Sequence, residues 1–527
     1  MKIKQLWVSN YKNIVDITLE FKADNITLLV GQNGLGKSNL LEILAIIFTN
    51  LDLLEAESDY NDWPYDTDNF EYDISYECKG ADIRINSMEG MFKVFKKGIE
   101  QPGDLQVINF DDFKKSKQQF FLPDHIIGYY SGENKRIKSI IQNHEKKVLS
   151  DLKTNKGLDN GFRRVFFSEN HHGQLILLTL LLYADPNKED NFNEAVESLI
   201  ENFSSFSELE EFGLQLKNPP WYNSNNKNHR ERGIDELEQN IIKADEFPFW
   251  NAKGKANKML RYLYDRNIAE LIYYNEKEFF DQPYEIIELN NIDKELIAEN
   301  LLITFEYPLD FFDALESLEL INVISSIHLN VKAKQDETTF DFRQLSEGEQ
   351  QLVTVLGLLL IVGKGDCLFL LDEPDTHLNP TWQRDYVKLL KQFNLNGLNS
   401  HIILATHSPL IVQAAEDADI FLYKRNQEGK IEILNNRDLK IHNWRIDQVL
   451  GSEFFGFQNT RPPQLDEFMA ERERLLSKSE LTKEDIESIR DMEEGGGILP
   501  SGETLNDFQA MHLVRTIAQQ IRNDQNQ

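Results

Sequence analysis

A glycine-rich loop near the start of the chain contains the first residues whose spacing suggests chemistry. Residues 31–38 read GQNGLGKS and match the pattern of a phosphate-binding loop. In such a loop the glycines bring the backbone close to the phosphates, a lysine contacts the β and γ phosphates, and a serine holds Mg²⁺. The residues that we expect to bind a nucleotide here are Asn33, Gly34, Gly36, Lys37, Ser38 and Asn39. We expect Lys37 to act in catalysis as well.

Two acidic residues and a histidine, each at the end of an apolar run, could complete a hydrolytic site. Asp372 and Glu373 follow CLFLL, and His407 follows HIILAT. An aspartate in this position can hold Mg²⁺, while the adjacent carboxylate can polarise an attacking water. We therefore expect Asp372 and Ser38 to be metal ligands, Glu373 to be the catalytic base, and His407 to reach the γ-phosphate. Each has a plainer explanation by itself, an acidic turn or a structural histidine, but the phosphate loop upstream favours catalysis.

The segment 345–351, LSEGEQQ, stands directly before a long apolar helix. It resembles the LSGGQ-type signature of ABC ATPases, in the SMC and RecF-like branch, and the loop ending Lys-Ser-Asn is similar to that branch too. The resemblance implies ATP and Mg²⁺ as cofactors. It also implies a homodimer or a higher homo-oligomer, because in that family the signature helix of one copy completes the site of the other. The residues that it implies to act in trans are Ser346, Gly348 and Glu349.

The chain departs from the family pattern at two positions. Glu347 replaces the first glycine of the signature, which puts the strength of ATP-driven closure in doubt. Asn379 stands where the family's D-loop has an aspartate, so communication between the two sites is expected to differ. The glutamine of the family's Q-loop has no clear counterpart in this sequence.

A parallel sheet is needed to bring these residues together. Continuous apolar runs at 26–30, 367–371 and 401–405 predict strands that are buried on both faces. The carboxyl ends of such strands collect ligands at one edge of an open sheet. We therefore expect an α/β fold: an ABC-type P-loop ATPase head with an inserted helical region and a helical C-terminal region. The pattern of residues 51–120, which follow the glycine-rich loop and precede the insertion, predicts antiparallel strands with long loops.

The expected division of the chain has four parts. They are 1–140, the first half of the ATPase core; 141–321, a mainly helical insertion; 322–433, the second half of the core with the signature, the acidic strand end and the histidine; and 434–527, a helical C-terminal region. The tail is expected to contain helices at about 465–476, 482–492 and 503–523.

Composition limits the partners and the location. The 527 residues include 88 Asp and Glu against 56 Lys and Arg, a net charge of -32, so any contact with nucleic acid must be local. Candidate clusters for a DNA backbone are Lys114, Lys115 and Lys117; Lys135, Arg136 and Lys138; and Arg230 and Arg232, although each is also consistent with a solvated face.

The longest apolar runs, 175–184 and 353–362, are shorter than the roughly 18 residues of a membrane span. With two distant cysteines and no signal peptide, we expect a cytoplasmic protein without membrane contact.

Taken over most of its length, the chain resembles the stand-alone ATPases of bacterial antiphage defence, most closely the Septu-type PtuA family, which also occurs in some retron systems. That resemblance implies a partner HNH nuclease, PtuB-like, supplied in trans, and DNA or a retron RNA/DNA complex as a further candidate partner. It implies that ATP-dependent head dimerisation controls the nuclease. Two alternatives stay open: a RecF-like DNA repair ATPase that clamps DNA, and a scaffold that binds ATP without turnover. A soluble transporter subunit fits the signature branch poorly.

Overall fold

The computed structural model describes most of the chain. Outside the described part lie 23–24, 55–69, 89–90, 99–103, 133–135, 155–161, 170, 186, 218, 220–248, 251, 265–269, 278–282, 293–296, 298–300, 337, 364, 395–399, 417, 436–440, 456–461, 479–481 and 496–527. The chain divides into two compact units, Met1–Ile446 and Asp447–Gln527. All the predicted site residues belong to the first unit.

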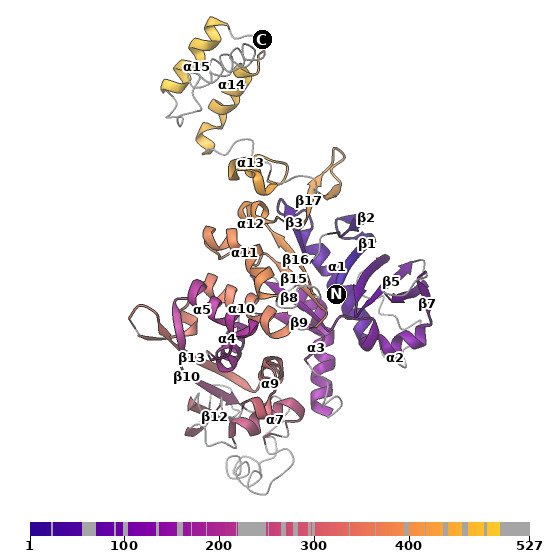
Figure 1. The fold of residues 1–527 in the computed structure, drawn as a ribbon, viewed down its shortest axis with the longest axis vertical. Coiled ribbons are helices and arrows are strands. Elements are labelled where there is room, and N and C mark those ends of the chain that lie inside the picture. Colours follow the sequence, from indigo (N-terminus) through magenta and orange to yellow (C-terminus); the bar gives the residue numbers. More distant parts are fainter. Residues whose placement is uncertain are drawn as a thin grey trace. The chain divides into compact units, whose positions relative to one another are not determined.

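A seven-stranded sheet forms the centre of the first unit (Figure 1), with the strand order β18-β17-β3-β16-β15-β8-β9. Its strands are β3 (Ile26–Gly31), β8 (His125–Tyr130), β9 (Val165–Ser168), β15 (Cys367–Asp372), β16 (Ser400–Thr406), β17 (Asp419–Arg425) and β18 (Ile431–Asn435). All neighbours are parallel except β17 and β18. The predicted parallel sheet is therefore confirmed.

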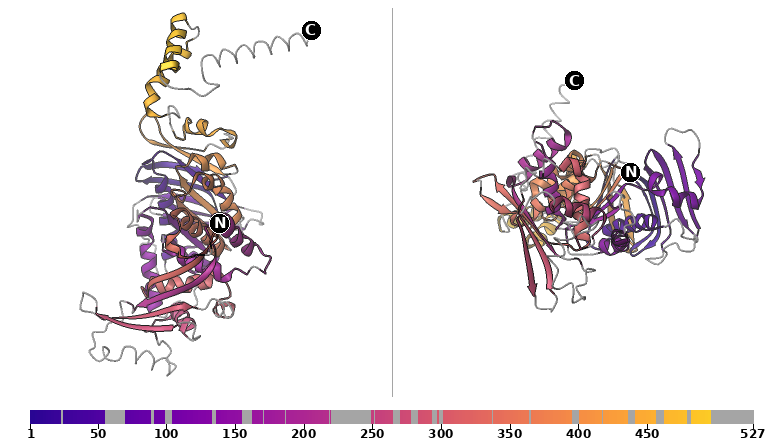
Figure 2. Two further views of the ribbon diagram at one scale, coloured as in Figure 1. Left: turned by 90° about the vertical axis from the view of Figure 1, so that its left-hand side faces the viewer. Right: turned by 90° about the horizontal axis from the view of Figure 1, so that it is seen from below.

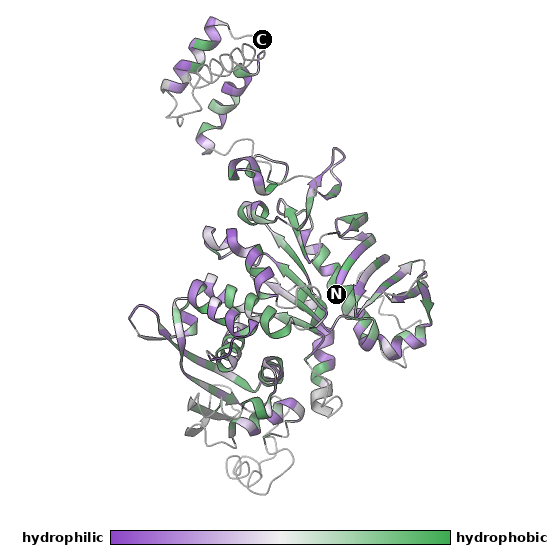
Figure 3. Cartoon of the chain, viewed as in Figure 1, coloured by the Kyte–Doolittle hydropathy of each residue, from purple (hydrophilic) through white to green (hydrophobic). Residues whose placement is uncertain are grey.

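Apolar residues explain why this sheet is central. Every residue of β3, β15 and β16 is buried, as expected for strands covered on both faces. Helix α1 (Lys37–Leu53) contacts β3, β8, β15 and β16, while α10 (Glu347–Val362) packs on α4 (His172–Tyr183) and α11 (Pro380–Phe393). Figure 3 shows hydrophobic residues throughout these strands and along α4 and α10. The strand ends that carry the candidate residues are thus held by a rigid core.

Two antiparallel sheets lie on opposite sides of the parallel sheet (Figures 1 and 2). The first has the order β2-β1-β4-β5-β6-β7, and its elements are β1 (Lys2–Tyr11), β2 (Ile14–Glu20), β4 (Tyr72–Cys78), β5 (Ala81–Met88), β6 (Met91–Gly98), β7 (Gln106–Ile108) and the neighbouring helix α2 (Phe110–Phe120). Along β4, buried and half-buried residues alternate, as one covered face requires. The antiparallel strands predicted between 51 and 120 are confirmed for the described residues.

The segment expected to be a mainly helical insertion contains strands as well as helices. Its helices are α3 (Arg136–Thr154), α4, α5 (Asn191–Phe203), α7 (Gly254–Tyr264) and α9 (Pro308–Leu320), and its strands are β9, β10 (Phe206–Lys217), β11 (Glu270–Lys277) and β12 (Pro283–Ile292). Strand β9 joins the parallel sheet, and the others join β13 (Ile324–Ala333) and β14 (Thr339–Asp341) in the order β11-β12-β10-β13-β14. The acidic stretch FSELEEFGLQLK of β10 has too irregular a burial pattern to predict a strand by alternation.

The second unit is helical in its described part. Helix α13 (Ile446–Leu450) begins at the boundary, and η4 (Pro463–Leu465), α14 (Asp466–Leu476) and α15 (Lys483–Gly495) follow. Leu475 and Ile489 form a small core between the last two helices. These helices agree with the predicted segments 465–476 and 482–492. The predicted helix at 503–523 lies outside the described residues.

A buried lysine closes the C-terminal end of α1. The Lys117 ammonium donates hydrogen bonds to the carbonyls of Leu51 at 2.9 Å and Asp52 at 2.6 Å, and also to that of Leu54. The last carbonyls of a helix have no partner within the helix and carry partial negative charge, so a cation there is stabilising. This residue of the predicted DNA-contact cluster therefore has its donors committed inside the chain.

We expect the Lys117→Met substitution to lower the free energy of unfolding by about 2 kcal/mol, because it leaves buried carbonyls without donors. Lys115, two residues earlier and exposed, provides the matched control. Its change to Met is expected to cost less than about 0.5 kcal/mol. Guanidinium unfolding of both variants measures the difference, and equal midpoints would contradict the capping role.

A second buried group makes the fold sensitive to acid. His401 on β16 accepts a hydrogen bond from the Ile3 N–H at Nδ1, 3.1 Å away, so its proton lies on Nε2, 3.0 Å from the Thr27 hydroxyl oxygen. Burial lowers the pKa of His401 to about 3. The folded chain therefore keeps this ring neutral at pH values where the unfolded chain binds a proton.

From this, stability is expected to fall as the pH drops below about 6.5, the pKa of an unperturbed histidine. Between pH 7 and pH 5 the His401 contribution is a loss of about 2 kcal/mol. In guanidinium unfolding at these two pH values, the His401→Gln variant should lose less stability on acidification than the unchanged chain. An equal loss would show that this ring is not responsible.

Candidate nucleotide site

The predicted site residues lie at the carboxyl edge of the parallel sheet. Strand β3 leads into the glycine-rich loop, β15 leads into Glu373, and β16 leads into His407. Register brings these ends level, because Asp372 pairs with Ala405 and Thr406 pairs with Val30. Residues separated by more than 300 positions in the sequence therefore meet at one edge.

An asparagine that sequence reasoning missed holds the glycine-rich loop. Asn13, in the turn between β1 and β2, donates from Nδ2 to the Gly34 carbonyl at 3.2 Å and accepts from Asn39 Nδ2 at 2.5 Å. Gly36 has φ +95°, and a Cβ there would lie 2.4 Å from Asn13 Oδ1, so only glycine fits. The Asn39 side chain donates to Asn13, and its contact with a nucleotide stays a prediction. Asn33 and Gly34 are exposed on the loop.

Lys37 is the first residue of α1 and lies among the other predicted groups. Its Nζ donates to the Gly31 carbonyl at 2.8 Å and lies 2.7 Å from His407 Nε2. Burial lowers the pKa of Lys37 to about 8, against the opposing effect of the Glu373 and Asp372 carboxylates. The ammonium is thus charged at neutral pH and close to the sheet edge, as binding to a phosphate requires.

Ser38 and Asp372 present two oxygen atoms to each other. The Ser38 hydroxyl donates to Asp372 Oδ1 at 3.1 Å, and Asp372 is buried at the end of β15. Burial raises the pKa of Asp372 to about 6, so the carboxylate is mainly ionised at neutral pH. A hydroxyl and a carboxylate are ligands that suit Mg²⁺, so the residues present fit this ion.

Glu373 is held in one orientation. Its Oε1 lies 3.3 Å from His407 Nε2, and the hydrogen bond with His407 lowers the pKa of Glu373. Its backbone has φ +49°, a conformation that costs a non-glycine residue about 1–2 kcal/mol. The Glu373 N–H donates to the Ala405 carbonyl at 2.9 Å, which fixes this strained residue to the next strand. The carboxylate is therefore ionised and fixed in position.

The predicted signature residues form the start of α10. Ser346 is the N-cap: its hydroxyl accepts from the Glu349 N–H at 3.3 Å, and Glu349 Oε2 accepts from the Ser346 N–H at 3.0 Å. The other oxygen of Glu349 accepts from the Ser205 N–H at 2.6 Å. Glu349, predicted to act in trans, is a buried carboxylate that caps its own helix in the single chain, and its role towards a second copy stays a prediction. Gly348 is buried and Ser346 is exposed.

The structure thus brings some of the predicted residues together and leaves others apart. Close polar contacts join His407 to Lys37 and to Glu373, a hydrogen bond joins Ser38 to Asp372, and the charge of Lys37 attracts both carboxylates, so the five residues form one cluster. Within the described part of the chain, no polar contact joins Ser346 or Gly348 to that cluster. Asn379 caps α11 by accepting from the Trp382 N–H at 3.0 Å, a role that an aspartate could also fill.

The basic clusters suggested for DNA are partly used for folding. Lys114 pairs with Asp111 at 3.1 Å, and Lys138 pairs with Glu169. Arg136 lies 3.9 Å from a carboxylate oxygen of the buried Glu42. Lys135, Arg230 and Arg232 lie outside the described residues.

Another group of side chains has the composition of a metal site. Ligand atoms of His171, His172 and Glu319 lie within 4.8 Å of one another. However, His172 Nδ1 accepts from the Glu169 N–H at 2.8 Å, so a neutral ring carries its proton on Nε2, the atom that faces Glu319. A histidine that binds a metal normally donates from its other nitrogen instead. The two histidines therefore make ion pairs and ring contacts.

The length and the apolar character of the helices can be compared with those of a membrane span. Among the helices of the described residues, none combines the length and the apolar character needed to cross a bilayer. The apolar runs that the sequence showed at 175–184 and 353–362 coincide with α4 and α10, which pack against each other.

Comparisons with known proteins agree with this geometry. The family model described as "AAA ATPase domain" matches residues 1–412. The chain is 25% identical over 225 residues to the Septu protein PtuA of Bacillus thuringiensis, covering 39% of this chain and 55% of that protein. It is 21% identical over 446 residues to the Retron Vc95 probable ATPase of Vibrio cholerae serotype O1 biovar El Tor, covering 80% of this chain and 73% of that protein. The predicted similarity to Septu and retron ATPases is confirmed.

The chain is also similar to solved structures. The SMC head domain from Thermotoga maritima is 12% identical, with a TM-score of 0.31, and covers 82% of this chain and 99% of its own. The recombination mediator protein RecF bound to ATP is 15% identical, with a TM-score of 0.28, and covers 82% and 97%. The chain spans about half of the Bacillus thuringiensis relative, 55%, and 26% of the Septu protein PtuA of Bacillus mycoides (strain KBAB4). Because the family model matches well over half of its 527 residues, the chain belongs to the AAA ATPase domain family.

Proposed function

We propose that the chain binds and hydrolyses ATP, that each site is completed by a second copy, and that this cycle controls a partner nuclease in a cytoplasmic antiphage defence complex. The observation that carries the proposal is the single cluster of Lys37, Ser38, Asp372, Glu373 and His407 at the sheet edge. An ammonium, a hydroxyl, two carboxylates and an imidazole are the groups that phosphoryl transfer requires.

The loop and the start of α1 would hold the nucleotide. The Lys37 ammonium offers charge to phosphate oxygens, and the helix N-terminus offers free N–H groups. Ser38 and Asp372 would hold Mg²⁺ through their oxygens. Bound ATP with Mg²⁺ supplies the phosphoanhydride bond to be cleaved and positive charge beside it. Asn13 keeps the loop in the shape that this binding needs, through its contacts with Gly34 and Asn39.

Glu373 would accept a proton from the attacking water. Its carboxylate is ionised because the hydrogen bond with His407 lowers its pKa. The same imidazole nitrogen, His407 Nε2, lies 2.7 Å from the Lys37 ammonium and 3.3 Å from Glu373 Oε1, so the ring contacts both groups. We assign His407 the role of orienting Glu373, and Lys37 that of stabilising charge on the phosphates.

The signature helix would serve the other copy. Ser346 is exposed at the N-terminus of α10, and its polar contacts lie within its own helix rather than with the Lys37 cluster. A helix N-terminus attracts anions through its unpaired N–H groups and its dipole. Head-to-tail pairing would present Ser346 and Gly348 to the nucleotide of the second copy, which is the arrangement that the ABC resemblance implies.

The defence role rests on the relatives. The proteins that match are called Septu protein PtuA and retron probable ATPase. We propose by analogy an HNH nuclease, PtuB-like, as partner in trans, with DNA or a retron RNA/DNA complex as a further partner. The net charge of -32 favours contact with nucleic acid through a partner rather than over a wide surface of this chain.

Co-expression with the protein encoded beside it tests the proposal. An HNH neighbour that co-purifies with the chain, and whose DNA cleavage changes on ATP addition, is the expected result. The Lys37→Ala chain should remove that ATP dependence. ATP turnover stimulated by DNA without a nuclease partner would instead indicate a repair ATPase, and unchanged regulation by Glu373→Gln would indicate a scaffold.

A further inference from the structure

The first turn of α10 docks on one residue, His377. Glu347 Oε2 lies 2.9 Å from His377 Nδ1, and Gln351 Oε1 accepts from the His377 N–H at 3.3 Å. Glu347 and Gln351 are four residues apart and so lie on one face of the helix. Gly348 lies close as well: a Cβ there would be 2.7 Å from the His377 carbonyl. Positions 347, 348 and 351 of the signature segment thus all lie against His377.

His377 is in turn connected to Glu373 through a short, cross-linked turn. The Thr376 hydroxyl donates to the Glu373 carbonyl at 2.9 Å, and the Leu378 N–H donates to the Asp375 carbonyl at 3.1 Å. Asp375 also accepts from the Thr406 hydroxyl at 2.9 Å. These bonds leave the turn little freedom. A displacement of His377 is therefore expected to move Glu373, four residues earlier, as well.

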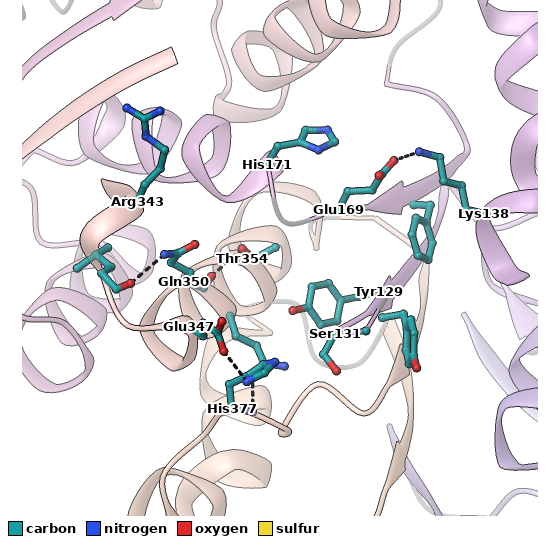
Figure 4. A pocket seen from close by; sticks show the side chains of 15 residues that line it. Tyr129, Ser131, Lys138, Glu169, His171, Arg343, Glu347, Gln350, Thr354 and His377 are labelled. Atoms are coloured by element: carbon teal, nitrogen blue, oxygen red, sulfur yellow. Dashed lines mark hydrogen bonds and ion pairs between the residues drawn. The ribbon is translucent and has the colours of Figure 1, made fainter. Parts of the chain in front are cut away.

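A cavity borders both the start of α10 and the end of β8. A space of about 890 Å³ is lined by the first turn of α10, by His377, and by Tyr129, Tyr130 and Ser131 at the end of β8. Figure 4 shows Glu347 and His377 joined at the border of this space, with Tyr129 of β8 and Ser131, just after the strand, also lining it. Gln351 also forms a side-chain hydrogen bond with Tyr129 of β8, so His377 provides one connection between the helix start and the edge of the sheet, beside this direct one.

We infer that His377 is a positioning residue, which couples the signature turn of α10 to the catalytic Glu373 through its contact with Glu347. The inference rests on the proposed function, because it supplies the route by which a second copy bound at the signature changes the site of this chain. It also assigns a role to Glu347, which replaces the family's glycine: its side chain contacts His377. The side chain of Glu347 is 77% exposed and that of His377 is 39% exposed, so the pair adds little to folding stability and can be changed without unfolding the chain.

Steady-state ATPase kinetics of the full chain tests this coupling. In His377→Ala and Glu347→Gln, kcat should fall at least about fivefold while KM for ATP changes little, since allosteric coupling is typically of this size. The double variant should fall no further than either single one, because both changes break one contact. His377→Asn, whose Nδ2 can replace Nδ1 as a donor, should recover much of the loss. His328→Ala, at another exposed histidine, is the matched control and should behave like the unchanged chain.

Hydrogen exchange supplies a readout that does not depend on turnover. In His377→Ala, peptides covering 345–352 and 373–379 should both exchange faster than in the unchanged chain. Unaltered kcat in the single variants, multiplied losses in the double variant, or faster exchange in only one of the two peptides would overturn the coupling. If Glu373→Gln loses turnover while the His377 variants do not, the proposed ATPase stands and only this inference fails. If the unchanged chain shows no turnover, the proposed function fails and the exchange result decides the coupling alone.

Discussion

Replacing Glu373 by glutamine is expected to slow ATP hydrolysis by about 10²- to 10⁴-fold, the usual contribution of a general base. Glutamine keeps the size of the side chain and can still bond to His407, but it cannot accept a proton from water. Binding of ATP should survive because Lys37, Ser38 and Asp372 are unchanged. Nucleotide-loaded dimers should therefore accumulate in this variant.

Single-turnover hydrolysis measures the loss of rate, and light scattering with and without ATP measures the accumulation of dimers. Glu428→Gln provides the control, because Glu428 is an exposed carboxylate paired with Lys430 on a surface turn. Turnover in Glu373→Gln equal to that of the control would remove Glu373 from catalysis. Loss of ATP binding would mean that this carboxylate holds the site together rather than acting on water.

Replacing Ser346 by arginine is expected to abolish turnover while leaving ATP binding at Lys37 intact. The residue is exposed at the tip of α10, where an arginine would project from the surface proposed to meet a second copy. The change also removes the N-cap hydroxyl, which costs about 1 kcal/mol. Ser346→Ala removes the cap without adding bulk and so separates the two effects.

Nucleotide affinity, thermal melting and ATPase rate are the three measurements for this pair. Ser346→Arg should match Ser346→Ala in melting temperature and match the unchanged chain in nucleotide affinity, but it should hydrolyse far less ATP than either. Full turnover in Ser346→Arg would contradict a shared site.

Local pattern predicted which residues meet at the edge of the sheet. The loop glycines, Lys37 and Ser38 could be identified because a phosphate loop needs a fixed spacing within eight residues. Asp372 and His407 could be identified because each follows a continuous apolar run, which predicts a buried parallel strand and hence a common edge. Both signals depend on neighbours in sequence, so one sequence is enough to read them.

Contacts between distant segments could not be read in this way. Asn13 supports the loop from another sheet, and nothing in its neighbourhood marks it. Lys117 looked like a surface charge because the helix end that it closes is more than 60 positions away. Glu349 stays a predicted trans-acting residue, but its capping contact and its bond to the Ser205 N–H could not be predicted, because an acid in the first turn of a helix can also point away from the cap.

The strands of the insertion show a different limit. Strand β9 has only four residues and forms one edge of the parallel sheet, and it is too short to show a period. In β10 the irregular alternation of buried and exposed residues reflects breaks in register with β13. Pairing with a remote strand, rather than local propensity, therefore determines these elements.

A mixing experiment tests the shared site most directly. Lys37→Ala should lose nucleotide binding, and Ser346→Arg should lose the ability of its α10 N-terminus to complete the site of a second copy. Each variant alone is therefore expected to be inactive. In an equimolar mixture, half of the dimers pair one of each, and every such dimer retains one intact site. The mixture should therefore recover roughly a quarter of the activity of the unchanged chain. A mixture as inactive as its components would contradict a site built from two copies, as would full activity in either variant alone.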